Sequence, residues 1–97
     1  QNKHSIKIKN MQVDEKILSN AIAKILKEIR LEKGKSLNLF CNEYSIPTTT
    51  LNDIENGKVN VRLFSLLKIL AAYKVDFVSF FEKLKTEIPS DFLSPEE

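Results

Sequence analysis

The sequence predicts an all-α fold, arranged as one domain of five helices. A chain of 97 residues that is 42% hydrophobic suits a single compact core. Only two glycines and three prolines interrupt it, and from Val13 to Ile88 the apolar residues recur at helical spacings. We therefore divide the chain into an N-terminal arm or short strand at 1–12, a helical domain at 13–88 and a C-terminal tail at 89–97.

The first helix is predicted from an apolar stripe with spacings of three and four residues. The stripe consists of Ile17, Leu18, Ala21, Ile22, Ile25 and Ile29. It predicts a helix of about sixteen residues that ends near Gly34, since glycine often follows the last turn of a helix. Lys24, Lys27 and Glu28 would lie on its solvent side.

Two short helices follow, joined by the turn Ser45-Ile46-Pro47. Ser36 can cap the first of them, whose inner face holds Leu37, Phe40, Cys41 and Tyr44. The inward positions of the second are Ile46, Leu51 and Ile54, and its outward positions are Thr48, Thr49, Asn52 and Asp53. Gly57 can end it in the left-handed conformation. This pattern is typical of a helix-turn-helix, whose second helix can enter a DNA major groove.

The fourth and fifth helices are predicted at about 62–74 and 76–86. The fourth has more apolar residues than one face needs, which predicts deep packing: Leu63, Leu66, Leu67, Ile69, Leu70 and Tyr73. Asp76 can cap the fifth. Its apolar residues, Phe77, Val78, Phe80, Phe81 and Leu84, wrap most of that helix. We expect them to form a self-association face with the tail residues Ile88, Phe92 and Leu93, although the intramolecular core could also use them.

Composition argues against several classes of function. No apolar run approaches the roughly 20 residues that cross a bilayer, and no signal peptide is evident, so we expect a cytoplasmic protein without a membrane role. Cys41 and His4 are the only cysteine and histidine, which offers no zinc site and no cysteine-histidine pair. We interpret Cys41 as a small buried apolar residue. With no catalytic set of side chains, neither an enzyme nor a cofactor is expected.

The N-terminal arm carries Lys3, His4, Lys7 and Lys9 around the alternating stretch Ser5-Ile6-Lys7-Ile8-Lys9. The alternation has the period of a strand, which could pair with its copy in a dimer. A flexible basic arm lying along DNA is a second interpretation, and a disordered leader is a third. Residues 1–35 hold a net charge of +5, whereas 36–61 hold −2 and 62–97 hold −1. The segment expected to meet DNA is therefore the least basic part of the chain.

Three stretches resemble the Cro and phage-repressor type of helix-turn-helix domain, the XRE family. They are Ile29-Arg30-Leu31-Glu32-Lys33-Gly34-Lys35-Ser36-Leu37, then Ile54-Glu55-Asn56-Gly57-Lys58, then Leu66-Leu67-Lys68-Ile69-Leu70 with Val75 and Phe80-Phe81. The resemblance covers about sixty residues, from Leu26 to Leu84. It implies a five-helix domain and an ion pair between Arg30 and Glu55 that joins the first helix to the reading helix.

The resemblance also implies which residues meet DNA. The base-contacting positions are Pro47, Thr48, Thr49, Asn52 and Asp53. Threonine can offer a hydroxyl or a methyl to base edges, asparagine can bond adenine through two atoms, and aspartate can accept from a cytosine amino group. The phosphate-contacting residues we expect are Ser36, Asn56, Lys58, Asn60 and Arg62. Similar domains hold a phosphate with a glutamine where this chain has Leu37.

The sequence therefore predicts a sequence-specific, repressor-like transcriptional regulator that binds double-stranded DNA as a homodimer, on a palindromic site. Similar small regulators include phage repressors, restriction-modification controllers and antitoxins, and the sequence does not choose among them. The alternative is an antitoxin-like interaction module, which dimerises or binds a protein partner and has weakened or lost DNA readout. The acidic Asp53 and the absence of arginine, lysine and glutamine from the outward face favour that alternative.

Overall fold

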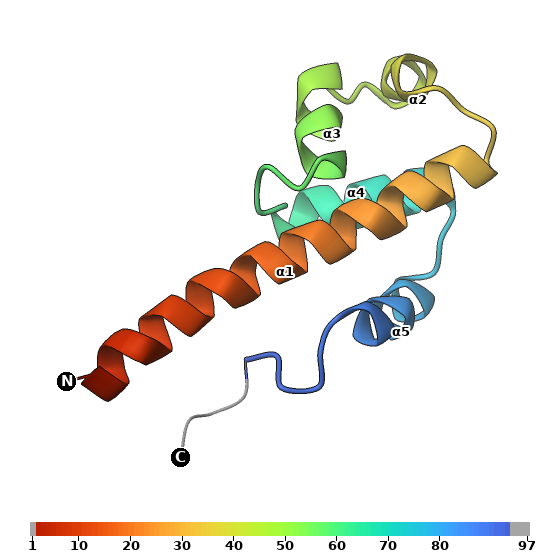
Figure 1. Ribbon diagram of the computed structural model, residues 1–97. Coiled ribbons are helices and arrows are strands. Elements are labelled where there is room, and N and C mark those ends of the chain that lie inside the picture. The colour runs from red at the N-terminus through yellow and green to blue at the C-terminus, as the bar shows by residue number, and fades with distance from the viewer. Residues whose placement is uncertain (1, 94–97) are drawn as a thin grey trace.

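The structure, a computed structural model, describes the backbone of residues 2–93 and the side chains of 13–93. Five helices make up this part of the chain, and no strand occurs in it. They are α1 (Asn2–Glu32), α2 (Leu37–Tyr44), α3 (Thr48–Glu55), α4 (Leu63–Tyr73) and α5 (Phe77–Glu87). In Figure 1, α1 crosses the whole molecule, with α2 and α3 on one side of it and α5 on the other. The all-α class and the five helices predicted from the sequence are confirmed.

The first helix is about twice as long as predicted, with 31 residues from Asn2 to Glu32. The expectation of a strand or extended arm at residues 1–12 is wrong for the part that is described, because residues 2–12 continue α1. Two physical reasons explain the difference. No glycine or proline occurs before Gly34 to break the helix, and a short strand in a single chain has no neighbouring strand to take its hydrogen bonds. The N-terminal half of α1 projects beyond the other helices (Figure 1).

The predicted caps and turns lie where the sequence places them. The Ser36 hydroxyl accepts a hydrogen bond from the Leu39 backbone N–H at 3.1 Å and starts α2. The Asp76 carboxylate accepts one from the Ser79 N–H at 3.1 Å and starts α5. Gly57, with φ of +67°, follows α3 in the left-handed conformation. These residues decide where the short helices begin and end.

One hydrophobic core joins all five helices. Its centre consists of side chains with almost no exposed surface: Ile25, Leu26, Phe40, Leu51, Leu70 and Phe80. The aromatic rings of Phe40 and Tyr73 stack with their centroids 4.2 Å apart and join α2 to α4. Because α1 contacts both α3 and α5, it is the central support of the domain. Within residues 2–93, none of the helices has the length and apolarity that spanning a bilayer requires.

Two helices are packed differently from the prediction. The start of α4 is not deeply packed, since Leu63 and Phe64 are 63% and 77% exposed. On α5, Phe80 and Leu84 belong to the intramolecular core. Assigning those two residues to a self-association face is corrected accordingly, because α5 turns that side toward α1. Phe77, Val78 and Phe81 remain exposed on the other side of α5.

Candidate nucleic-acid interface

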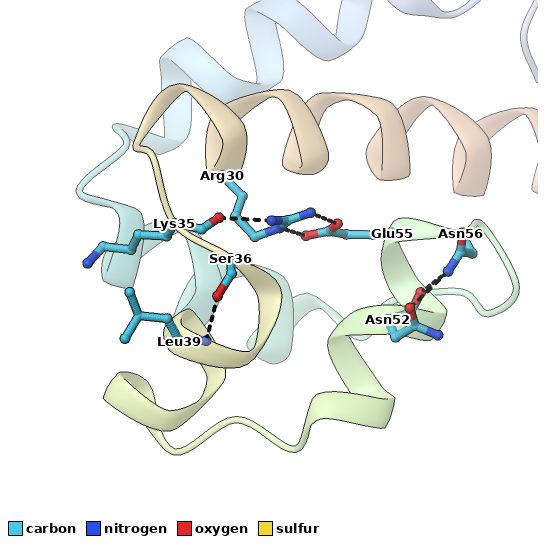
Figure 2. A network of polar contacts seen from close by, with 7 residues as sticks. All are labelled: Arg30, Lys35, Ser36, Leu39, Asn52, Glu55 and Asn56. Carbon is cyan, nitrogen blue, oxygen red and sulfur yellow. Dashed lines mark hydrogen bonds and ion pairs between the residues drawn. The ribbon is translucent and has the colours of Figure 1, made fainter.

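A buried ion pair joins α1 to the end of α3. Arg30 Nε donates to Glu55 Oε2 at 2.8 Å, and Arg30 Nη2 donates to Glu55 Oε1 at 3.0 Å, so the contact is bidentate (Figure 2). The two side chains are only 9% and 4% exposed. A paired, planar contact of this kind fixes orientation as well as distance. The structure thus brings together the two residues that the resemblance paired, and it holds α3 against α1.

Arg30 makes a third hydrogen bond, to the loop that precedes α2. Arg30 Nη1 donates to the Lys35 carbonyl at 2.9 Å, in the loop between α1 and α2 (Figure 2). Hydrogen bonding to Glu55 raises the pKa of Arg30 above its usual range, so its charge is permanent. One side chain therefore ties the end of α1, the entry to α2 and the end of α3 together.

Two polar groups lie in the core next to this pair. The Cys41 side chain is buried, and burial raises the pKa of its thiol, which agrees with an inert packing role. Tyr73 is buried as well, and its hydroxyl finds no hydrogen-bond partner within the described part of the chain. Burial is the main cause that raises the pKa of Tyr73, and the nearby Glu55 carboxylate adds to it. The unpaired tyrosine hydroxyl is a feature that sequence reasoning missed.

The outward face of α3 is open to solvent at four of its five predicted base-contacting positions. These four are Pro47, Thr48, Thr49 and Asn52. The fifth, Asp53, is half-buried and lies with Arg62 on the wall of a shallow hollow between α3 and the start of α4. An open row of small polar side chains on a firmly held helix is the geometry that base-edge contacts need.

A second polar contact orders the end of α3. Asn56 Nδ2 donates to the Asn52 carbonyl at 2.7 Å and to Asn52 Oδ1 at 3.2 Å (Figure 2). Both residues are exposed, one helical turn apart. Phosphate contact by Asn56 stays a prediction, and the structure adds that its side chain already has partners within α3.

The start of α2 offers a different kind of contact from the one that similar domains use. Leu37 packs half-buried against the core, so no side chain reaches outward from that position. Ser36 is exposed, and its oxygen already accepts from the Leu39 N–H. Its hydroxyl hydrogen can still be donated, because serine is both donor and acceptor. Ser36 therefore stays a candidate for phosphate contact.

The loop after α3 is fastened to the middle of α1. Lys16 Nζ donates to the Gly57 carbonyl at 2.8 Å, and the buried Ser19 hydroxyl donates to Asn60 Oδ1 at 2.6 Å. Asn60 Nδ2 donates in turn to Glu15 Oε2 at 2.6 Å. Asn60, predicted to contact phosphate, thus has both ends of its amide engaged by α1. Lys58 and Arg62, the two cationic candidates of this region, are exposed.

The sequence did not predict that three α1 residues, Glu15, Lys16 and Ser19, hold this loop by hydrogen bonds. The only signal was Ser19, a small polar residue next to the apolar stripe of α1. A buried hydroxyl needs a hydrogen-bond partner, which can be the carbonyl one turn back, as Glu15 provides here at 3.1 Å, or a polar neighbour from elsewhere in the chain. The helical spacing of apolar residues in α1 does not identify Asn60 as a partner, since 41 residues separate Ser19 from Asn60.

Comparisons with known proteins agree with this architecture. The profile of a family described as helix-turn-helix matches residues 26–80, more than half of the chain. Among solved structures, the chain is similar to the wild-type restriction-modification controller protein C.Esp1396I, with 30% sequence identity and a TM-score of 0.67. That similarity covers 81% of this chain and 96% of the other. A comparison with curated protein sequences gave no match.

Proposed function

Because this chain belongs to the helix-turn-helix family of XRE-type DNA-binding regulators, we propose that it binds double-stranded DNA as a homodimer and regulates transcription, with α3 in the major groove. The proposal rests on one observation: α3 is held firmly in the fold while its outward residues are exposed. Its far end is fixed by the bidentate contact between Arg30 and Glu55, while Pro47, Thr48, Thr49 and Asn52 lie open to solvent. A reading helix needs both properties, since weak contacts from short side chains discriminate only when the helix is rigid.

Contacts to phosphate would come from both sides of α3. The start of α2 offers the Ser36 hydroxyl and free backbone N–H groups, and the far loop offers Lys58. Arg62, at the start of α4, extends that side. Because Lys58 and Arg62 are only two cations, we expect the DNA affinity of a single domain to depend weakly on salt concentration. We also expect stable binding to need two copies of the domain on one operator. The similarity to a restriction-modification controller protein supports a regulatory role.

The dimer would use the exposed apolar residues of α5. Phe77, Val78 and Phe81 are 42%, 65% and 42% exposed, which is unusual for three large apolar side chains on one short helix. Burying such a patch against a second copy would remove it from water. Val78→Lys should therefore shift the protein toward monomer in analytical ultracentrifugation, and Thr86→Lys, at an exposed position of the same helix outside the patch, is the matched control. A wild-type protein that is monomeric even at high concentration contradicts the symmetric mechanism.

DNA binding is tested by selection from a random duplex pool, followed by titrations between about 50 and 200 mM salt. The expected result is an enriched palindrome whose affinity falls as salt rises. Lys58→Gln and Arg62→Gln should each reduce the salt slope by about one. The control is Lys83→Gln on α5, where Lys83 faces Glu28 of α1 at 3.5 Å. No enriched sequence, together with no effect of Lys58→Gln and Arg62→Gln, contradicts the DNA-binding proposal.

Charge supports a second candidate, an interaction module that binds a protein partner. Residues 36–61, which contain α2 and α3, hold a net charge of −2. Phe64, 77% exposed at the start of α4, adds apolar surface outside the α5 patch. Negative charge and exposed apolar surface both favour binding to a protein partner over binding to the DNA polyanion. The selection experiment separates the two candidates, because an interaction module of this kind enriches no duplex sequence.

A further inference from the structure

Asn56 makes three hydrogen bonds to a single residue of the reading helix. Its backbone N–H donates to the Asn52 carbonyl at 3.1 Å. Its side-chain Nδ2 donates to the same carbonyl at 2.7 Å and to Asn52 Oδ1 at 3.2 Å. Since Asn56 is the residue that ends α3, its backbone position is set by the helix itself. Its side chain is therefore a fixed donor beside Asn52.

This contact decides which half of the Asn52 amide is available. Its oxygen is turned toward Asn56, and its nitrogen points away from it (Figure 2). The nitrogen carries two N–H groups, and no acceptor for them is present among the described residues. Asn52 is exposed on the outward face, one turn after Thr48 and Thr49. The exposed part of this side chain is thus a donor.

We propose that Asn52 reads the acceptor edge of a guanine and that Asn56 is the residue that positions it; this inference rests on the proposed DNA-binding function. In the major groove, guanine presents two acceptors, N7 and O6, to an incoming donor. The usual asparagine contact is with adenine, and it needs the amide oxygen to accept from the adenine amino group. In this chain the amide oxygen is turned toward Asn56, so the amino group is the part of the side chain that points outward, and it meets an acceptor of guanine rather than the amino group of adenine. Asn56 acts through Asn52 rather than through a phosphate.

The test compares base preferences selected from a random duplex pool by the wild type and three variants. Asn52→Ala identifies the base position that Asn52 reads, because the preference there disappears. At that position the wild type should select guanine. Asn56→Ala frees the amide to rotate, and the selection of guanine over adenine should fall at least about fivefold. Preferences at all other positions should stay as in the wild type.

Asn56→Asp is the sharper variant, since it reverses the hydrogen bond rather than removing it. An aspartate carboxylate accepts from the Asn52 nitrogen and turns the Asn52 oxygen outward. The selected base should then change from guanine to one that presents an amino group, adenine or cytosine. Total affinity should also fall, because the new charge repels phosphates, but the base preference is measured within one selection. A purely structural role for Asn56 would lower affinity without changing the selected base.

The outcomes separate this inference from the proposed function. If the wild type enriches no sequence, the DNA-binding function itself fails. If it enriches a site but selects a base other than guanine at the Asn52 position, or if Asn52→Ala changes no position, the inference is overturned while the function stands. Unchanged selection of guanine by Asn56→Ala also overturns it. Circular dichroism establishes that each variant folds, and Asn56→Ala alone decides the outcome if the aspartate variant does not.

Discussion

Removing the Glu55 carboxylate should cost more stability than any surface substitution in this domain. In Glu55→Ala, the Arg30 guanidinium stays in a site where it is 9% exposed, and both of its bonds to Glu55, at 2.8 and 3.0 Å, are lost. Its remaining partner is the Lys35 carbonyl. Leaving one charge of a buried pair without its partner typically costs about 3–5 kcal/mol. In a domain of this size that corresponds to a fall in melting temperature of at least about 12 °C.

The matched control is Glu43→Ala, which breaks an ion pair of shorter distance but greater exposure. Lys35 Nζ lies 2.7 Å from Glu43 Oε1, with the side chains 29% and 43% exposed. Exposed pairs contribute about 0–1 kcal/mol, since water and salt screen them. Urea denaturation followed by circular dichroism gives both free energies of unfolding. If the two substitutions cost the same within about 1 kcal/mol, burial is not what gives the Arg30 pair its strength, and the reasoning is refuted.

Two further predictions concern the core and the loop after α3. Tyr73→Phe should leave stability unchanged or raise it by about 1 kcal/mol, because the buried hydroxyl has no partner to lose. Burial raises the pKa of Tyr73, so wild-type stability should fall as pH rises above about 10, where the unfolded chain releases the phenol proton and the folded chain keeps it. The advantage of Tyr73→Phe should therefore grow between pH 8 and about pH 11 in urea denaturation, and a constant difference contradicts this. Gly57→Ala should cost about 1–2 kcal/mol for its φ of +67° and more for a collision of the new Cβ with the Asn20 side chain. Gly34→Ala, with φ of +71° and no atom within 4 Å of the added Cβ, measures the backbone cost alone; equal losses in the two variants would mean that Asn20 yields without cost.

Local patterns in the sequence were enough to predict most of the helices. The caps at Ser36 and Asp76 and the left-handed Gly57 are decided by residues within one helical turn, so they can be read directly. The inward faces of α2 and α3 follow in the same way from their period. The contact between Arg30 and Glu55 is different, since it joins residues 25 apart and came from the family resemblance rather than from any local pattern.

The features that the sequence did not predict depend on tertiary contacts or on competition between alternatives. The alternating residues near the N-terminus have the period of a strand, but the helix prevails because it satisfies its own backbone hydrogen bonds. Phe80 and Phe81 look alike in sequence, and only the rotation of α5 against α1 buries the first and exposes the second. The orientation of the Asn52 amide depends on a hydrogen bond that composition and period cannot specify.

One helix controls both ends of the candidate DNA-contacting region. Near its C-terminus, α1 holds the end of α3 through Arg30, and near its middle it holds the following loop through Lys16 and Ser19. The second set of contacts comes from residues before 26, where the match to the helix-turn-helix family begins. The loop that carries Lys58 is therefore positioned by a part of α1 that the family match does not include. A change in this segment can alter the spacing between α3 and the loop without touching either, because both are fastened to the same rigid helix.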